Sequence, residues 1–124
     1  MNLLLDTHVL LWWLAASKNL SREARQAVLA GERVFVSAAT VWEISIKVAR
    51  GKLRVQGDLE EHLRINRFHP LPVTVAHALA AGALPRHHGD PFDRMLVAQA
   101  VIESLTLVTA DKRQAAYEVP VILV

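Results

Sequence analysis

The chain contains no cysteine, which excludes a disulfide framework, a thiolate metal site and a cysteine nucleophile. It also lacks any apolar run that approaches the roughly 20 residues needed to cross a membrane. The N-terminus has no basic segment before its first apolar run and no small-residue cleavage site, so we expect no signal peptide. These absences fit a reducing compartment, and we expect a cytoplasmic protein without a membrane partner.

An excess of charge of one sign is also missing. The 14 lysines and arginines nearly balance the 12 aspartates and glutamates, and the formal net charge is +2. Net charge therefore says little about partners, and the distribution of the charges says more. Apolar residues make up 52% of the 124 residues, which is enough for a sizeable core. Because no repeat, low-complexity tract or composition break divides the chain, we predict a single domain over residues 1–124.

The segment that organises the chain runs from Asn2 to Asp6. Its three leucines form a short run without charge, which is typical of a strand buried on both faces in the middle of a parallel sheet. The run ends at the Asp6 carboxylate, and an apolar helical segment follows directly. Open α/β sheets place their chemistry at the carboxyl ends of such strands. The alternative is that Asp6 only caps the following helix.

Hydrophobic periodicity and capping residues predict strands that alternate with helices along the whole chain. Strands are expected at residues 2–5, 33–36, 106–109 and 119–124, with a short edge strand within the proline-containing segment 68–73. Helices are expected at residues 7–16, 22–30, 38–50, 58–66, 74–83, 91–104 and 111–117. Gly31 and Gly51 are expected to end two helices, Gly31 through a left-handed turn. The alternation predicts an α/β fold with a mostly parallel central sheet.

Asp111 repeats the pattern of Asp6, because it follows the apolar segment from Thr106 to Ala110. Parallel strands end on the same edge of a sheet, so both carboxylates are expected at one edge if both strands are central. The alternative for Asp111 is again a helix N-cap.

Glu43 lies in the middle of the predicted helix 38–50, four residues before Lys47. Its simplest role is an exposed ion pair with that lysine, worth roughly 0.3–0.5 kcal/mol. Glu43 would take part in chemistry only if it projects toward the carboxylates at the sheet edge.

Asp90 and Asp93 flank Pro91 and Phe92 at the start of a predicted helix. Asp90 fits the N-cap, Pro91 the first helical position, and Asp93 the third position of a capping-box-like arrangement. Both carboxylates would favour the positive end of the helix dipole. The helix behind them is apolar nearly all round, so we expect it to be buried and its first turn to be held rigidly.

No single acid is convincing, but their conjunction is informative. Three or four carboxylates in one crevice repel each other, and some of their pKa values rise. A divalent cation removes that conflict, and all-oxygen ligands suit Mg²⁺ or Mn²⁺. Such an ion can activate water and stabilise the charge of a phosphoryl transition state.

Four short motifs stand in a fixed order along the chain: Leu4-Leu5-Asp6-Thr7, Trp42-Glu43-Ile44, Asp90-Pro91-Phe92-Asp93-Arg94-Met95-Leu96 and Thr109-Ala110-Asp111. In order and spacing they resemble the signature of PIN-domain nucleases, and most of all the VapC toxins of bacterial toxin–antitoxin modules. The resemblance extends over essentially the whole chain. It implies a PIN-like α/β/α sandwich, a Mg²⁺- or Mn²⁺-dependent endoribonuclease that acts on RNA as a toxin, and a small VapB-like antitoxin as partner.

The resemblance also implies which residues form the site. The family's four acids, which would hold the metal and act in catalysis, fall on Asp6, Glu43, Asp93 and Asp111. Asp90 is an additional acid, and Thr109 matches a small hydroxyl residue that the family keeps near the site. His8 departs from the asparagine or serine that is often found two places after the first acid, so it is assigned no role.

Basic residues near these acids are candidates for contacts with RNA phosphates if the protein is a nuclease. They are Lys47, Arg50, Arg94 and Lys112. An ordinary solvated face explains them about as well.

Two adjacent pairs of large side chains complete the prediction. Trp12 and Trp13 make the helix 7–16 unusually apolar. We expect them in the core, and their alternative role is a partner face or the interface of the homodimer that we also expect. His87 and His88 are expected to lie in a polar loop and not to form a metal pair, because adjacent side chains usually diverge.

Three other functions compete with the nuclease. A phosphatase with Asp6 as nucleophile lacks its usual second aspartate, since His8 stands in that position. A receiver-like signalling domain pairs acids next to each other after its first strand, and Asp6 has no acidic neighbour. A catalytically inactive PIN-like scaffold that only binds a partner stays open, although the presence of all four acids argues against it.

Overall fold

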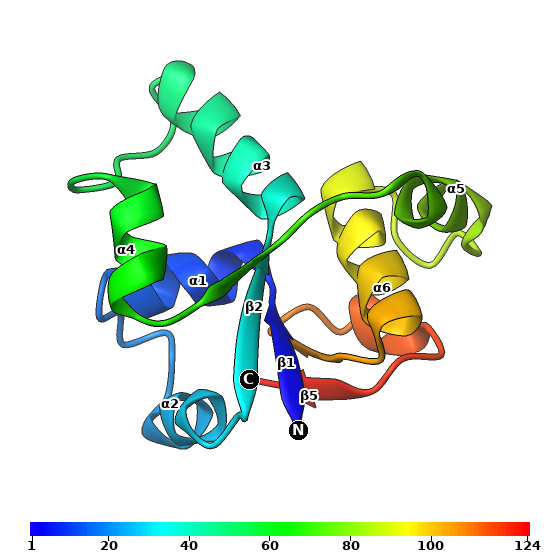
Figure 1. Ribbon diagram of the computed structural model, residues 1–124, viewed down its shortest axis with the longest axis horizontal. Helices are drawn as coiled ribbons and strands as arrows, with labels where there is room; N and C mark the ends of the chain where they lie inside the picture. The colour runs from blue at the N-terminus through cyan, green and yellow to red at the C-terminus, as the bar shows by residue number, and fades with distance from the viewer.

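The sheet at the centre of the molecule has five strands in the order β3-β2-β1-β4-β5, and all four pairings are parallel (Figure 1). The computed structural model describes all residues from 1 to 124. The strands are β1 (Asn2–Leu5), β2 (Arg33–Ser37), β3 (His69–Leu71), β4 (Thr106–Thr109) and β5 (Val121–Leu123). The predicted α/β fold is therefore confirmed, and the proline-containing β3 is an edge strand as expected.

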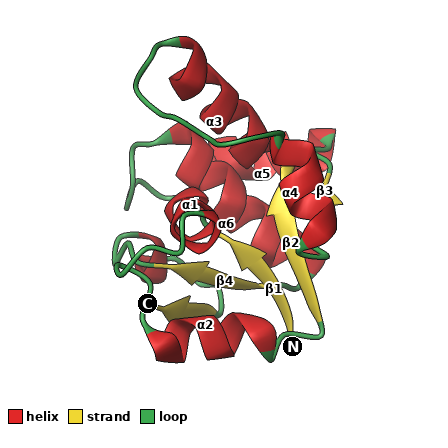
Figure 2. Ribbon diagram, turned by 90° about the vertical axis from the view of Figure 1, so that its left-hand side faces the viewer, coloured by secondary structure: helices red, strands yellow, loops and turns green.

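Helices lie on both faces of the sheet (Figure 1 and Figure 2). One face carries α1 (Thr7–Leu14), α2 (Arg22–Leu29) and α4 (Leu59–Ile65), and the other carries α6 (Pro91–Glu103) with α5 (Val75–Ala83) beside it. Helix α3 (Ala38–Ala49) extends outward from the carboxyl end of β2, and a 3₁₀ turn (Gln114–Ala116) lies between β4 and β5. None of these helices combines the length and the apolar character that crossing a membrane requires.

Strand β1 is buried on both faces because its leucines alternate between two hydrophobic clusters. Leu3 and Leu5 pack with residues of α1, α2 and α4, whereas Leu4 packs with residues of α6 and β4. Figure 1 shows the sheet edge-on between these two layers. The charge-free run that predicted a central strand is thus explained by a core on either side.

The strand order places the carboxyl ends of β1 and β4 at a point where the chain changes direction. From β1 the chain moves through β2 to β3 at one edge, and it then adds β4 and β5 on the opposite side of β1. Leu5 pairs with Val108 in the β1–β4 ladder, so Asp6 and Thr109 leave the sheet side by side. A crevice opens at such a point because the connections leave it in opposite directions.

Gly31 does not adopt the left-handed conformation that the sequence predicted. The two glycines with positive φ are Gly51, at 70°, and Gly57, at 76°. A Cβ atom on Gly31 would lie 2.8 Å from Leu3 Cδ1. Glycine is therefore needed there because α2 ends close against β1, and not because of its backbone conformation.

Two further predictions need correction. Helix α6 is less buried than its composition predicts, because Val101 and Ile102 near its C-terminus are exposed to solvent. The helix predicted over residues 111–117 is limited to the short 3₁₀ turn. The buried part of α6 begins at Leu96, one turn after the acids at its start.

Trp12 and Trp13 of α1 pack against the core, as predicted. Both are partly buried beside the cluster that contains Leu3 and Leu5. Trp13 also donates its indole N–H to Asn66 Oδ1 at 3.0 Å and contacts the ring of Phe68. Trp13 is thus held by polar and aromatic contacts from the segment after α4.

We predict that Leu4→Ala lowers the free energy of unfolding by about 2–5 kcal/mol, because it leaves a cavity in the cluster between β1 and α6. Urea unfolding followed by circular dichroism measures the loss. Leu79→Ala is the matched control, since Leu79 is 72% exposed on α5, and it should change the stability by no more than about 0.5 kcal/mol. Equal losses in the two variants would contradict the central position of β1.

Candidate metal and active site

Asp6 stands at the carboxyl end of β1 and is buried. Its Oδ1 accepts the backbone N–H of His8 at 2.8 Å and caps α1, whereas its Oδ2 accepts the hydroxyl of Thr109 at 2.7 Å. The exposed His8 ring lies near Oδ1, and this contact with Asp6 raises the pKa of His8. The capping role that the sequence left open is present, and it leaves the second carboxylate oxygen directed across the crevice.

Thr109 links the two strand ends. Its hydroxyl oxygen accepts the backbone N–H of Asp111 at 3.0 Å and also lies 2.5 Å from Gln114 Oε1. A hydroxyl has one proton, and the charged Asp6 oxygen competes for it more strongly than an amide oxygen does. Thr109 therefore holds Asp6 and the start of the Asp111 segment in a fixed relation.

Asp111 faces the same crevice, where it lines a pocket of about 370 Å³ together with Asp6 and Lys112. Its carboxylate accepts a forked pair of hydrogen bonds from Arg113, Nε to Oδ1 at 3.1 Å and Nη2 to Oδ2 at 2.9 Å. These bonds lower the pKa of Asp111 to about 2. Asp111 is therefore ionised at neutral pH.

Glu43 reaches the site from α3, and only 7% of its surface is exposed. Its Oε1 accepts the hydroxyl of Thr7 at 2.8 Å, and Thr7 directly follows Asp6 in the chain. Its Oε2 accepts Lys47 Nζ at 2.9 Å, which is the i,i+4 pair that the sequence predicted. The pair exists, but it is not a simple surface pair, because the glutamate is buried and tied to the start of α1.

The two acids at the start of α6 have different partners. Asp90 Oδ1 accepts the backbone N–H groups of Phe92 at 2.8 Å and of Asp93 at 3.1 Å, which is the geometry of an N-cap. The predicted capping-box-like role of Asp93 is not found, because the Asp90 N–H donates to His88 Nδ1 instead. Asp90 is thus committed to the helix cap, and Asp93 is left directed toward the other carboxylates.

Asp93 is the acid that responds most to the negative charge of the cluster. Its pKa is raised from 3.8 to about 7. Loss of solvent is the largest cause, followed by repulsion from Asp6 and Asp90 and, more weakly, from Glu43. His88 acts in the opposite direction. Asp93 therefore favours a bound proton or a nearby cation.

His88 lies between two of the acids and is 6% exposed. Its Nε2 is 2.9 Å from Asp93 Oδ2 and 3.0 Å from Asp111 Oδ2. These three side chains offer ligand-type atoms that all lie within 4.8 Å of one another. As predicted, both histidines lie in a loop and their side chains diverge. His88 is buried beside the acids, whereas His87 is exposed and packs on the ring of Tyr117.

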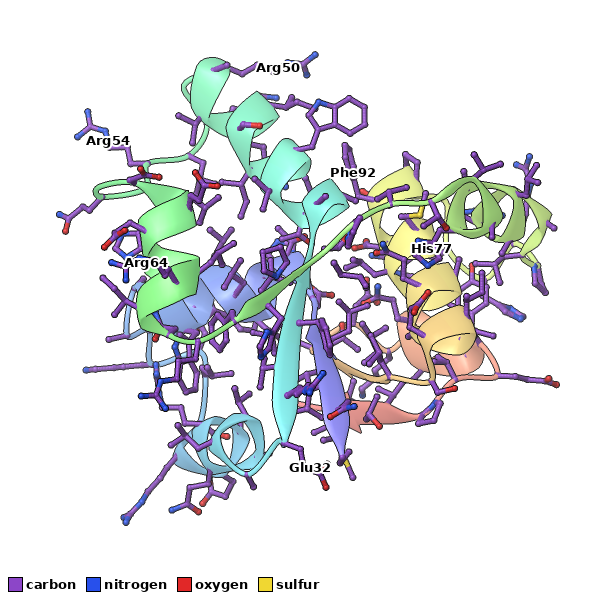
Figure 3. The ribbon with its side chains drawn as sticks, viewed as in Figure 1. Glu32, Arg50, Arg54, Arg64, His77 and Phe92 are labelled. Atoms are coloured by element: carbon purple, nitrogen blue, oxygen red, sulfur yellow. The ribbon has the colours of Figure 1, made fainter.

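Of the four basic residues singled out in the sequence, Lys112, Lys47 and Arg50 lie at different places relative to the crevice. Lys112 lines the pocket at the ends of β1 and β4. Lys47 is held by its ion pair with Glu43. Figure 3 shows Arg50 at the outer end of α3, pointing away from the rest of the molecule. Lys112 is thus the cation best placed beside the acids.

Arg94 has a structural role in the α5–α6 connection. Its two terminal nitrogens donate to backbone carbonyl groups of Ala81, Leu84, Pro85 and His88. A contact between Arg94 and an RNA phosphate would have to compete with these bonds.

Sequence reasoning missed three side chains that orient the acids: Thr7, His88 and Gln114. Gln114 is buried, and its Nε2 donates to the backbone carbonyl of Asp93 at 3.3 Å. Thr7 could have been found, because it belongs to the first motif and directly follows Asp6. No local pattern identifies His88 or Gln114, since the acids they contact come from other parts of the chain.

Comparisons with known proteins find a matching family model and a similar curated protein. The family model of the PIN domain matches residues 3–120. Ribonuclease VapC22 of Mycobacterium tuberculosis (strain ATCC 25618 / H37Rv) is 34% identical over 125 residues, which cover 94% of this chain and 92% of that protein.

Solved structures share the fold. A chain of the VapBC2 complex from Rickettsia felis bound to a promoter DNA fragment matches with a TM-score of 0.76 at 15% identity, over 99% of this chain and 98% of that chain. A chain of a toxin–antitoxin complex from Klebsiella pneumoniae matches with a TM-score of 0.69 at 20% identity, over 96% and 94%. At these identities the likeness concerns the fold alone.

We predict that Mn²⁺ raises the melting temperature of the protein, and that it does so more at pH 8 than at pH 6. A cation that binds only the native state stabilises it by mass action, and below about pH 7 it competes with the proton on Asp93. The folded protein binds this proton more tightly than the unfolded chain, so its contribution to stability is lost as the pH rises through about 7. Differential scanning fluorimetry with Mn²⁺ or with EDTA measures both effects.

Two variants test this assignment. Asp6→Asn should abolish most of the Mn²⁺-induced rise. Asp93→Asn should make the melting temperature in EDTA less dependent on pH between 6 and 8, because asparagine does not titrate. If Mn²⁺ raised the melting temperature of Asp6→Asn as much as that of the wild type, Asp6 would not be a metal ligand. If the melting temperature of Asp93→Asn in EDTA depended on pH as that of the wild type does, the raised pKa of Asp93 would be contradicted.

Proposed function

This chain belongs to the PIN-domain family and to the VapC ribonucleases within it, and from this premise we propose that it is a Mg²⁺- or Mn²⁺-dependent endoribonuclease. We propose further that it acts as the toxin of a toxin–antitoxin module. The relative that shares 34% of its residues is a ribonuclease, and the solved structures of the same fold come from toxin–antitoxin complexes.

The observation that carries the proposal is that acids from four elements lie close enough to act on one another: beyond loss of solvent, Asp6 and Glu43 raise the pKa of Asp93, and Asp93 and Asp111 contact the same nitrogen of His88. The acids are Asp6 after β1, Glu43 on α3, Asp93 on α6 and Asp111 after β4. Loss of solvent and, after it, repulsion from Asp6, Asp90 and Glu43 raise the pKa of Asp93. Groups perturbed in this way cluster at functional sites, where a ligand can relieve the repulsion.

The available donors suit Mg²⁺ or Mn²⁺. Carboxylate oxygens are the ligands that both ions prefer. The raised pKa of Asp93 supports the fit, because repulsion from Asp6 and Asp90 adds to the larger effect of lost solvent, and a divalent cation would relieve that repulsion. The residues that would hold the ion are Asp6, Glu43, Asp93 and Asp111.

A bound ion of this kind would supply the activation of a water molecule and the stabilisation of negative charge on a phosphodiester during its hydrolysis. The chain's own residues provide the orientation. Hydroxyl donors fix two of the carboxylates, from Thr109 to Asp6 and from Thr7 to Glu43. Lys112 places a positive charge at the pocket that an RNA phosphate would approach.

The phosphatase alternative receives little support from this geometry. The second aspartate that such a phosphatase keeps two residues after its nucleophile is replaced by His8, whose exposed ring lies near Asp6 Oδ1. The alternative of an inactive scaffold is separated from the ribonuclease by the cleavage assay below.

We predict that the protein cleaves a mixed single-stranded RNA with Mg²⁺ or Mn²⁺ and leaves it intact with chelator. Asp93→Asn should remove cleavage, whereas Asp90→Asn should retain it, because asparagine caps a helix about as well as aspartate. Asp90→Ala should lose about 1 kcal/mol of stability, because it removes the helix cap. Gel electrophoresis of the RNA and thermal unfolding measure the two effects. If Asp90→Asn removed cleavage and Asp93→Asn retained it, Asp90 would be the metal ligand in place of Asp93. Intact RNA with the wild-type protein and Mn²⁺ would leave a PIN-like scaffold as the better account.

A small VapB-like antitoxin is the proposed partner, with an arginine that reaches into the crevice. Arg113 supports this proposal, because its fork on Asp111 has the bidentate geometry that an incoming guanidinium would use. A mostly apolar groove of about 690 Å³ between α3 and α4 offers room for the rest of such a partner. Its lining includes Val41, Val48 and Leu63.

We predict that expression of this chain alone arrests growth. Asp6→Asn, or co-expression of the neighbouring reading frame, should relieve the arrest, because the first removes the metal site and the second supplies the inhibitor. Optical density after induction measures the effect. A wild-type chain that is expressed in full and leaves growth unchanged would contradict the toxin role.

A homodimer remains part of the proposal. Large apolar side chains are exposed on α3 and α5: Trp42 at 63%, Val75 at 77% and Leu79 at 72%. Tryptophan is enriched at protein interfaces, and exposed apolar surface favours association. Sedimentation of a monomer at micromolar concentration would count against it.

A further inference from the structure

We propose that His88 is a positioning residue that shares its Nε2–H between Asp93 and Asp111 and does not itself bind the metal. The inference rests on the proposed function, because it concerns two of the acids that would hold the ion there. His88 lies outside the four motifs, in the connection between α5 and α6. Its proximity to two acids makes it look like a third ligand, and its hydrogen bonds assign it a different role.

The hydrogen bonds of the imidazole determine its tautomer. The backbone N–H of Asp90 donates to Nδ1 at 3.0 Å, so Nδ1 presents a lone pair. The neutral ring therefore carries its proton on Nε2. Nε2 lies 2.9 Å from Asp93 Oδ2 and 3.0 Å from Asp111 Oδ2, within donating distance of both. A protonated Nε2 has no lone pair to offer to a cation.

The donor that sets this tautomer is itself fixed. Asp90 is the N-cap of α6, and its side chain bonds the N–H groups of Phe92 and Asp93. The direction of the Asp90 N–H therefore follows from the start of the helix. Binding a metal through Nε2 would move the ring proton to Nδ1, where it would face the Asp90 N–H and leave a buried donor without an acceptor.

The position of the ring is fixed from the backbone side. The His88 N–H donates to Tyr117 Oη at 3.0 Å, and the His88 carbonyl accepts Arg94 Nη1 at 3.3 Å. Tyr117 is buried as well. The backbone contacts hold the Cα from which the ring extends, so the bonds that Arg94 makes to the α5–α6 connection also serve the site. The bond from the Asp90 N–H to Nδ1 keeps the ring itself turned toward the acids.

A shared N–H donor sets the separation of two acids that come from different elements. Asp93 lies in the first turn of α6, and Asp111 follows β4. A single N–H donor between them fixes both Oδ2 atoms in place. Residues that hydrogen-bond to metal ligands without binding the metal tune the metal affinity by holding the ligands in place.

Electron spin-echo spectroscopy of Mn²⁺ bound to the wild-type protein tests the inference without a mutation. We expect no hyperfine coupling from a directly bound ¹⁴N nucleus. A ligand-type nitrogen coupling that disappears in His88→Gln would overturn the proposal, because it would identify His88 as a ligand.

Mn²⁺ affinity measured by isothermal titration calorimetry gives the second readout. His88→Ala removes the donor and should weaken binding about 10–100-fold. His88→Gln places an amide N–H near the position of Nε2 and should restore most of the affinity. The control is His87→Gln, which changes an exposed neighbour that contacts neither acid and should leave Mn²⁺ binding unchanged.

Melting in EDTA establishes which of these variants fold. If His88→Ala does not fold, His88→Gln and the spin-echo spectrum decide the question. Binding by folded His88→Gln that is 10–100-fold weaker than wild type would overturn the proposal, and so would binding by His88→Ala as tight as wild type.

Neither readout uses RNA, so the two proposals can fail separately. Mn²⁺ binding with the expected His88 behaviour but intact RNA would refute the ribonuclease and leave the role of His88 standing. RNA cleavage with a nitrogen-bound Mn²⁺ would refute the role of His88 alone. A wild-type protein that binds no Mn²⁺ would refute both.

Discussion

The closeness of several carboxylates to the partly buried Asp93 is the constraint on which the rest of this structure depends. Each acid comes from, or closely follows, an element anchored in a hydrophobic cluster, and each accepts a hydrogen bond or ion pair from a neighbouring donor. The donor–acid pairs are Thr109–Asp6, Thr7–Glu43, His88–Asp93 and Arg113–Asp111. Since the acids are held together, loss of solvent and, after it, repulsion from Asp6 and Asp90 raise the pKa of Asp93.

Helix capping and the arrangement of the site use the same side chains. Asp6 and Asp111 each accept a following backbone N–H with Oδ1 and direct Oδ2 to another element. Asp90 caps α6 with Oδ1, and its cap releases Asp93 from that role. The structural and functional interpretations of an acid at a strand end are therefore not alternatives, because a carboxylate has two oxygens.

The parts of this protein that could be predicted from its sequence have local signals. A charge-free run between polar residues marks β1, and an acid directly after it marks the sheet edge. The role of Gly31 depends instead on its closeness to Leu3 in the folded protein. His88 depends on an acid 23 residues further along the chain. Periodicity and capping rules describe neighbours in sequence, so they cannot identify either residue.

The chemical character of the donors decides where negative charge stays concentrated. Glu43 and Asp111 are each paired with a cation, Lys47 and Arg113 respectively. Asp6 and Asp93 have hydroxyl and imidazole donors in place of lysine or arginine, and Asp6 is the largest source of charge repulsion on Asp93. Within the proposed function, a divalent cation is therefore attracted most strongly between these two acids. Because Thr109 and His88 orient them without a full positive charge, the donors hold the site in shape and leave its charge for the ligand.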